Sequence, residues 1–366
     1  MTFMRKSVVW LSLAIAGGMV ACSDSNPDVS PGEMASAPSG GSSAISGAGA
    51  TFPYPIYAKW ADAYKTKTDI GLNYQSIGSG GGIKQIKANT VTFGASDKPL
   101  KPEELDEAGL IQFPMVMGGV VPVVHVEGIE GGDLALDGPT LADIFSGKVA
   151  KWNSPEIAVL NPGVELPDTA NAIVHRSDGS GTTFNFTYYL SSVSPTWEEE
   201  IGADSAVQWP VGIGAKGNEG VANMVTQTNG AIGYVEYAYA LQNDMAYTKM
   251  KNADGVVVEP SAENFQAAAA NADWANAPGY YLILTNQPGA DSWPMTAATF
   301  ILVYKEPKDP AALKTALDFF DWAYASGDEM ADELHYVPMP DAVVNMVKKT
   351  WAESIKDSSG KALWTN

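Results

Sequence analysis

A single stretch in the middle of the chain, Arg176 to Phe184, constrains the fold of this sequence more than any other. It reads Arg-Ser-Asp-Gly-Ser-Gly-Thr-Thr-Phe, with an apolar pair before it and an aromatic-rich segment after it. The pattern predicts a strand, a glycine turn and the start of a helix. Arg176, Ser180, Thr182 and the first N–H groups of the helix are all hydrogen-bond donors. Because those N–H groups lack partners within the helix and the helix dipole favours negative charge, the stretch predicts a site for a tetrahedral oxyanion.

Two further glycine-rich turns precede predicted helices nearer the N-terminus. The segment from Gly47 to Pro55 contains Thr51 at a position suited to a helix N-cap, and Ser79-Gly-Gly-Gly offers Ser79 as the cap of the next helix. A short predicted strand from Val91 then ends in the carboxylate of Asp97. The chain is therefore predicted to present three helix N-termini of the same kind.

The length and charge of the chain narrow the classes of protein that it can belong to. Its 366 residues exceed the roughly 250–300 at which single cores stop growing, so we expect two lobes. The formal net charge of −20 argues against nucleic acid or an anionic membrane surface as a partner. An anion site is still compatible with this charge, because surface charges are screened beyond about 8 Å whereas donors that touch a buried ligand are not.

Residues 1–22 have the layout of an export signal. The basic pair Arg5-Lys6 precedes an apolar run from Val8 to Ala16, which is too short for a bilayer-spanning helix of about 20 residues. Cys22 is the only cysteine, so an intrachain disulfide is excluded. The sequence Met-Val-Ala-Cys ending at Cys22 resembles a bacterial lipobox and predicts lipidation of Cys22. The alternative is ordinary cleavage near Ala21.

Residues 23–44 are predicted to be a flexible tether. Val29 and Met34 are the only large apolar side chains in this segment, which is otherwise rich in Ser, Pro, Gly and Asp. Such a composition cannot bury enough apolar surface to fold alone. A flexible chain of this length spans roughly 25 Å.

Several segments of the chain, and the order in which they occur, resemble the phosphate-binding subunit of Pst-type ABC phosphate importers, a type II periplasmic binding protein. The similarity extends over nearly the whole chain after residue 45, and four of its segments correspond to the binding site of that family. The segments are Gly47 to Tyr57, Tyr74 to Lys84, Phe93 to Asp97, Leu141 to Gly147 with Lys151-Trp152, Arg176 to Phe184, Gly230 to Tyr239 and Ile355 to Lys361.

The resemblance implies an α/β fold of two lobes, each a mostly parallel sheet covered by helices, joined by crossing hinge strands. The segments Met115–Val124 and Thr299–Tyr304 are apolar and β-branched enough to be those crossings. Lobe one is then expected at residues 45–118 plus 297–366, and lobe two at 119–296.

The resemblance also implies the ligand, its contacts and the partners. Inorganic phosphate is expected between the lobes, with membrane permease and ATPase subunits of an ABC importer as partners and no cofactor or metal. The protein is expected to be a monomer on the periplasmic side of the envelope, anchored through a lipid on Cys22. The expected phosphate-binding residues, with Phe52 and Gly181 acting through the backbone, are Thr51, Phe52, Ser79, Asp97, Arg176, Ser180, Gly181 and Thr182.

The charges expected at this site nearly balance. Three helix N-termini at about half a charge each and Arg176 bring roughly +2.5, against −3 from dibasic phosphate and Asp97. An ionised carboxylate only accepts hydrogen bonds, and phosphate near neutral pH carries a hydrogen that sulfate lacks. We therefore expect Asp97 to select phosphate over sulfate. The alternative is that Asp97 only caps a turn.

Asp178 is expected to support Arg176. An ion pair between them would hold the guanidinium in place while its remaining donors reach the ligand. The alternatives for this stretch are that Arg176 is only a structural ion-pair partner and that Ser180 and Thr182 are ordinary caps.

The alternatives to phosphate transport are another ligand, an enzyme and a scaffold. The alternative ligand is another tetrahedral oxyanion such as sulfate. A phosphate-ester hydrolase would need a base beside Ser180, but the nearest histidine in sequence, His175, is expected on the opposite face of the strand from Arg176, and the Gly-x-Ser-x-Gly elbow is absent. No catalytic residue is therefore assigned. A surface adhesin or scaffold would bind no small ligand.

Overall fold

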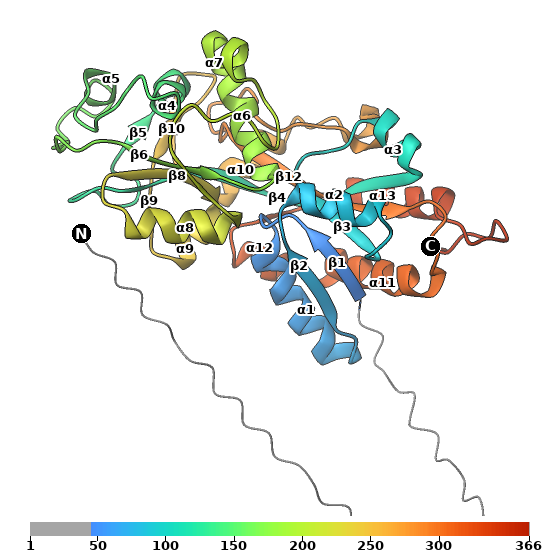
Figure 1. Ribbon diagram of the computed structural model, residues 1–366. Helices are drawn as coiled ribbons and strands as arrows, with labels where there is room; N and C mark the ends of the chain where they lie inside the picture. Colours follow the sequence, from blue (N-terminus) through green and yellow to red (C-terminus); the bar gives the residue numbers. More distant parts are fainter. Residues whose placement is uncertain (1–44, 366) are drawn as a thin grey trace, which may run out of the picture. The chain divides into compact units, whose positions relative to one another are not determined.

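The computed structural model describes residues 45–365. The predicted signal peptide at 1–22, the tether at 23–44 and Cys22 lie outside the described residues. The strands of the main sheet are β1 (Ile45–Gly49), β2 (Leu72–Ser76), β3 (Phe93–Ser96), β4 (Leu110–His125), β6 (Ala172–Arg176), β7 (Ile213–Ala215), β8 (Ala231–Glu236), β9 (Ala246–Tyr247), β12 (Thr296–Tyr304) and β13 (Val337–Pro338). They are joined in the order β2-β1-β3-β12-β4-β8-β6-β7, and β13 and β9 also pair with β4 (Figure 1). A small second sheet contains β5 (Ala135–Leu136), β10 (Lys249–Lys251) and β11 (Val257–Val258).

Helices cover both faces of the sheet. They are α1 (Tyr54–Thr68), α2 (Ser79–Lys87), α3 (Pro102–Ala108), α4 (Gly138–Phe145), α5 (Pro155–Ala158), α6 (Gly181–Val193), α7 (Pro195–Glu200), α8 (Gly217–Gln227), α9 (Tyr237–Gln242), α10 (Ala262–Ala269), α11 (Pro310–Ser326), α12 (Asp328–Asp332) and α13 (Asp341–Ser354). In Figure 1, α8 and α9 lie on the opposite side of β8 from α4 and α6. Within residues 45–365, none of the helices combines the length and the apolar character that a bilayer crossing needs.

Strand β4 runs through the middle of the sheet and connects its two sides. Residues 110–119 pair with β12 and residues 120–125 pair with β8. All of its residues except His125 are buried, which explains its unbroken apolar and β-branched sequence. We call β1, β2, β3 and β12 with their helices the first half, and β6, β7 and β8 with theirs the second half. The predicted strands Met115–Val124 and Thr299–Tyr304 lie within β4 and β12 and are confirmed as strands; the lobe boundaries remain a prediction.

The strand directions bring the glycine turns together. In the first half β1 runs parallel to β2 and β3, and in the second half β6 runs parallel to β7 and β8, whereas β4 and β12 run antiparallel to their neighbours. Parallel strands of one sheet present their carboxyl ends at the same edge, where such folds bind ligands. The predicted α/β architecture, with parallel strands in each of two halves and long strands that connect them, is thus present.

Candidate functional site

The first-half turns start helices at positions that differ from those predicted. Thr51 is not the N-cap of α1, which begins at Tyr54 with Pro53 in the cap position and no side-chain cap. Tyr54 is flanked by two prolines, which suit only the first turn of a helix, so the helix begins at this point. Ser79 is likewise not a cap but the first residue of α2, because Gly78 occupies the cap position with φ of 86°. A non-glycine residue rarely adopts that conformation.

The second-half turn follows the prediction closely. Strand β6 ends at Arg176, α6 begins at Gly181, and the Ser180 hydroxyl accepts a hydrogen bond from the N–H of Thr183 at 3.0 Å. The strand, glycine turn and capped helix are confirmed. The cap interaction uses an acceptor site of Ser180, so its hydroxyl hydrogen remains available to donate.

Arg176 and Asp178 form a bidentate ion pair. Arg176 Nε and Nη2 donate to Asp178 Oδ1 and Oδ2 at 2.8 and 2.6 Å. Burial by itself raises the pKa of Asp178, but the hydrogen bonds and charge of Arg176 outweigh it and lower that pKa. Arg176 is 3% exposed, and its Nη1 has no hydrogen-bond partner among the described residues. Asp178 therefore aligns the guanidinium and leaves one buried nitrogen of Arg176 unused.

Asp97 is a buried acid with an unpaired oxygen. It is 2% exposed, and burial raises its pKa to about 7. Its Oδ2 receives a long hydrogen bond of 3.4 Å from the Ser79 hydroxyl, while Oδ1 has no partner among residues 45–365. The adjacent turn is held instead by the Ser96 hydroxyl, which bonds the carbonyl and N–H of Lys98. Asp97 thus does not act as the cap of that turn.

The glycine turns of the two halves are in direct contact. The N–H of Gly80 donates to the carbonyl of Gly179 at 2.9 Å, and the N–H of Gly181 donates to the Ser79 hydroxyl at 3.1 Å. A Cβ atom on Gly181 would lie 2.5 Å from Ser79 Oγ and 2.6 Å from the Cβ of Asp97. Only glycine at this position permits the contact, and the structure therefore describes the two halves closed on each other.

Replacing Gly181 with alanine is expected to weaken anion binding without unfolding the second half. The added methyl group would meet Ser79 and Asp97 across the closed interface, so closure becomes less favourable by about 1–3 kcal/mol, or roughly 5- to 150-fold in Kd. Isothermal titration would measure the loss. Gly163→Ala would be the surface control, because nothing lies within 4 Å of a Cβ there, although its φ of 89° adds local strain. An unchanged Kd in Gly181→Ala would contradict the assigned contact.

The predicted binding residues are brought together from both halves. Thr51, Phe52, Ser79 and Asp97 come from the carboxyl-end turns of the first half, and the rest come from the start of α6 and the end of β6. All are buried. Ser79 contacts both Asp97 and Gly181, and Thr51 and Thr182 share a partner, Asn218.

Sequence reasoning missed four contributors at this interface. They are Asn218 on α8, Glu236 at the end of β8, Tyr239 on α9 and Tyr336 before β13. The hydroxyl of Tyr239 donates to the carbonyl of Thr51 at 2.7 Å, and that of Tyr336 lies 2.6 Å from the carbonyl of Phe52. The segment Gly212 to Gly217, which contains β7 and the first residue of α8, repeats the strand, glycine and helix pattern of the other turns. That signal could have identified Asn218.

Glu236 is buried beside Tyr336 and is expected to hold a proton. Burial raises its pKa to about 8. The Tyr336 hydroxyl lies 2.7 Å from Glu236 Oε2 and also contacts the Phe52 carbonyl, yet it has one hydrogen for two acceptors. The Tyr336 hydrogen is thus shared between Glu236 Oε2 and the Phe52 carbonyl, and Oε2 also accepts the N–H of Ala238 at 3.0 Å.

Replacing Glu236 with glutamine is expected to stabilise the phosphate-free protein at high pH. The folded protein keeps a proton on Glu236 that the unfolded chain loses above its ordinary pKa of 4.5, so stability falls as pH rises toward about 8. Glutamine removes this dependence, giving a gain of about 3 kcal/mol at about pH 8.5 relative to about pH 5.5. Denaturant unfolding at both pH values would measure it, with the exposed Glu127→Gln as control. If the variant and the wild-type protein differ in unfolding free energy by the same amount at both pH values, Glu236 is not a buried, protonated group.

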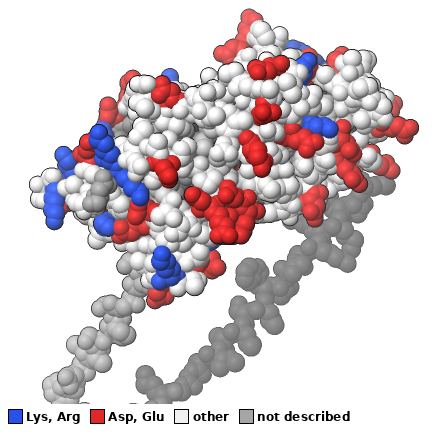
Figure 2. All heavy atoms as spheres, turned by 180° about the vertical axis from the view of Figure 1, so that it is seen from behind, with Lys and Arg blue, Asp and Glu red and all other residues white. Residues whose placement is uncertain are grey.

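The electrostatic balance of the site includes a fourth helix. The N-terminus of α8 faces Asp178, whose Oδ1 accepts from the N–H of Gly217 at 3.1 Å. This helix N-terminus offsets part of the charge of Asp178, which the sequence-based balance left out. Figure 2 shows acidic side chains spread over the face in view and basic ones gathered mainly toward one end. The positive groups of the site are instead buried, where screening is weak.

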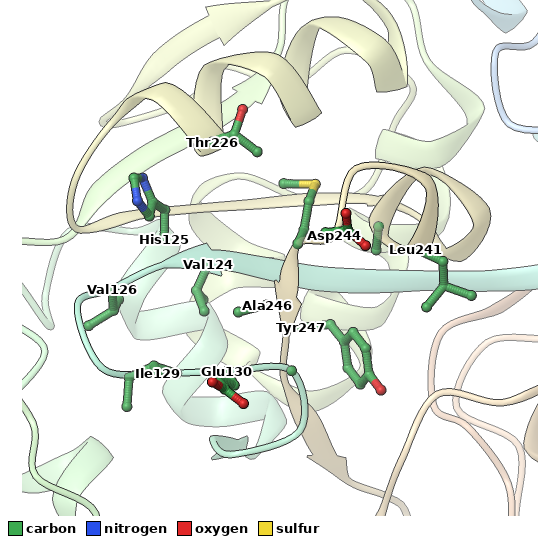
Figure 3. A pocket seen from close by; sticks show the side chains of 13 residues that line it. Val124, His125, Val126, Ile129, Glu130, Thr226, Leu241, Asp244, Ala246 and Tyr247 are labelled. Carbon is green, nitrogen blue, oxygen red and sulfur yellow. The ribbon is translucent and has the colours of Figure 1, made fainter.

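A surface cavity elsewhere does not suit an oxyanion. A cavity of about 620 Å³ lies between the end of β4, α8 and α9 (Figure 3). Its lining includes Glu130 and Asp244 but no Lys or Arg. An anion would meet two carboxylates there and no cation.

The structure does not assemble a hydrolase around Ser180. The ring of His175 stacks on Trp209 with centroids 4.8 Å apart, and its Nδ1 lies 3.0 Å from the carbonyl of Arg176. Among the described residues no hydrogen bond joins His175 to Ser180. In the same part of the chain, no group of three or more His, Cys, Asp or Glu side chains is placed to hold a metal.

A family model, curated relatives and solved structures all relate this chain to binding proteins. Residues 35–326 match the model of the PBP superfamily domain. The chain is 57% identical over 312 residues to the phosphate-binding protein PstS of Xylella fastidiosa, which covers 85% of this chain and 86% of that protein. It is 55% identical over 320 residues to the protein of the same name from Pasteurella multocida, covering 87% and 93%. A phosphate ABC transporter substrate-binding protein with bound phosphate from Clostridium perfringens has the same fold, with a TM-score of 0.60 at 21% identity over 81% of this chain and 100% of that one.

Proposed function

The chain belongs to the PBP superfamily and, within it, to the phosphate-binding proteins named PstS, and from this membership we propose that it captures inorganic phosphate for an ABC importer. Phosphate is bound between the two halves of the sheet. Its proposed contacts are Thr51, Phe52, Ser79, Asp97, Arg176, Ser180, Gly181 and Thr182, and Asp178 aligns Arg176.

One observation supports phosphate in particular. Two buried polar atoms of the site, the donor Arg176 Nη1 and the acceptor Asp97 Oδ1, have no hydrogen-bond partner among the described residues. Buried polar groups are normally satisfied, and one ligand that touches both atoms would satisfy them. A ligand that fits must accept several hydrogen bonds and also offer one hydrogen. Phosphate near neutral pH does both, whereas sulfate has no hydrogen to offer.

Titration of the purified, phosphate-free chain tests the proposal. Phosphate is expected to bind and to change tryptophan fluorescence as the halves close, whereas sulfate is expected to bind at least 100-fold more weakly because it leaves Asp97 unpaired. Arsenate, which shares the shape and the hydrogen of phosphate, serves as a positive comparison. Equal affinity for sulfate and phosphate would favour a general oxyanion-binding protein, and no affinity for either would refute the proposal.

The proposal extends to the location, the membrane anchor and the partners of the protein. We infer that it works on the periplasmic side of the envelope as a monomer tethered through a lipidated Cys22, and that it delivers phosphate to permease and ATPase subunits. Cys22→Ser is expected to move the protein from the membrane fraction to the soluble fraction of cells. We also infer that the protein is not an enzyme, and a phosphate-ester substrate is expected to release no phosphate.

A further inference from the structure

We infer that Asn218 is a positioning residue that turns the hydroxyl hydrogens of Thr51 and Thr182 toward the ligand. This inference rests on the proposed function and adds a residue to it. Asn218 is fully buried at the start of α8 in the second half, yet it contacts Thr51 in the first half. It therefore joins the two threonines across the closed interface.

The contacts of Asn218 place donors against both threonine oxygens. Its Nδ2 donates to Thr51 Oγ1 at 2.7 Å and to Thr182 Oγ1 at 3.2 Å, and its backbone N–H donates to Thr51 Oγ1 at 3.1 Å. The orientation of the amide is set by its other end, because Oδ1 accepts the N–H of Glu236 at 2.9 Å. A flipped amide would place its NH₂ against that N–H, so the side chain has one satisfactory orientation.

This arrangement determines what the hydroxyl groups can do. A hydroxyl has two acceptor sites and one hydrogen. Both acceptor sites of Thr51 Oγ1 are used by Asn218, and one of those of Thr182 is used too. Among residues 45–365, no acceptor takes the hydrogen of either hydroxyl. The remaining capacity of each threonine is thus to donate, which is what an anion with several acceptor oxygens requires. Without Asn218, each hydroxyl could rotate and present a lone pair to the anion, which is repulsive.

A mutant cycle tests the inference through phosphate affinity. Asn218→Ala is expected to raise the phosphate Kd about 10- to 100-fold in the wild-type background. In a background of Thr51→Val and Thr182→Val, where no hydroxyl remains to be oriented, the same change is expected to raise Kd by less than about 3-fold. An Asn218→Ala effect of equal size in both backgrounds would assign Asn218 a merely structural role and overturn the inference.

A second variant keeps the test decisive if Asn218→Ala does not fold. Asn218→Asp retains the acceptor for Glu236 but faces the threonines with an oxygen, which draws their hydrogens away from the ligand. Its added negative charge repels phosphate in both backgrounds, so the difference between the backgrounds is what reports hydroxyl orientation. Its effect on Kd is expected to be larger than that of alanine and again to be smaller in the double-valine background. Equal effects in both backgrounds would overturn the inference. If the wild-type protein binds phosphate and the cycle shows no coupling, only this inference fails; if the wild-type protein binds no phosphate, the proposed function fails first.

Discussion

Replacing Arg176 with methionine is expected to weaken phosphate binding by two to four orders of magnitude. Arg176 is the buried cation of the site, and its Nη1 is free for a ligand among the described residues. Truncating one partner of a buried, hydrogen-bonded charge pair costs about 3–5 kcal/mol, which corresponds to roughly 10²- to 10⁴-fold in Kd. Isothermal titration with phosphate would measure the change. A loss of less than 10-fold would mean that the helix N-termini bind the anion without Arg176.

The loss of Arg176 also leaves Asp178, whose side chain is 11% exposed, without its cation, so the effect on folding must be separated from the effect on binding. An uncompensated charge that is mostly buried is expected to destabilise the protein by up to about 3 kcal/mol. Adding Asp178→Asn to Arg176→Met removes that charge and keeps an acceptor for the N–H of Gly217. The double variant is expected to recover stability in denaturant unfolding but not phosphate affinity.

A surface ion pair supplies the matched control for this experiment. Lys151 and Asp168 are 2.6 Å apart, but their side chains are 55% and 66% exposed. Lys151→Met therefore removes an ion pair of similar length with an expected effect on stability below about 1 kcal/mol. Phosphate affinity should not change. Recovered affinity in the Arg176 and Asp178 double variant would show that the guanidinium acts only as a structural partner of Asp178.

Local features of the site could be predicted from the sequence because they are set by neighbouring residues. Ser180 caps α6 through a bond to Thr183, three residues on, and Arg176 pairs with Asp178, two residues on. The strand before Asp97 was also recognisable from its composition. Interactions over such short separations are determined by backbone geometry, so residue type and spacing suffice to predict them.

Contacts between the halves could not be predicted in the same way. Asn218 meets Thr51 although 167 residues separate them, and Ser79 meets Gly181 across 102. The hydroxyls of Thr51 and Ser79 were predicted to cap helices because that is their common local role, but in the structure they bond groups of the opposite half. Whether such a residue caps its own helix or contacts the other half depends on how closely the two halves approach, which no local pattern records.

Replacing Asp97 with asparagine is expected to reduce the preference for phosphate over sulfate by about 100-fold or more. Asparagine has nearly the same size, but its NH₂ group donates hydrogen bonds, whereas an ionised carboxylate only accepts them. Sulfate, which is fully ionised, then gains a donor where it met a like charge. Phosphate can no longer offer its hydrogen to an anionic acceptor and is expected to bind more weakly. Competition titrations with both anions would measure the two changes. The exposed Asp168→Asn is the control for the loss of one negative charge.

The pH dependence of sulfate binding gives this prediction a second, independent measurement. Because burial raises the pKa of Asp97 to about 7, the carboxyl group is protonated below that pH and becomes a donor. Sulfate affinity of the wild-type protein is therefore expected to rise more steeply as pH falls from about 8.5 to about 5.5 than that of Asp97→Asn, whose remaining change reports the nearby carboxyl group of Glu236 with its pKa of about 8. At high pH the Asp97→Asn variant is thus expected to bind sulfate in the way that the wild-type protein does at low pH. If sulfate affinity is independent of pH in the wild-type protein, or rises equally in Asp97→Asn, then a group other than Asp97 excludes sulfate, and the unpaired Oδ1 has a different role.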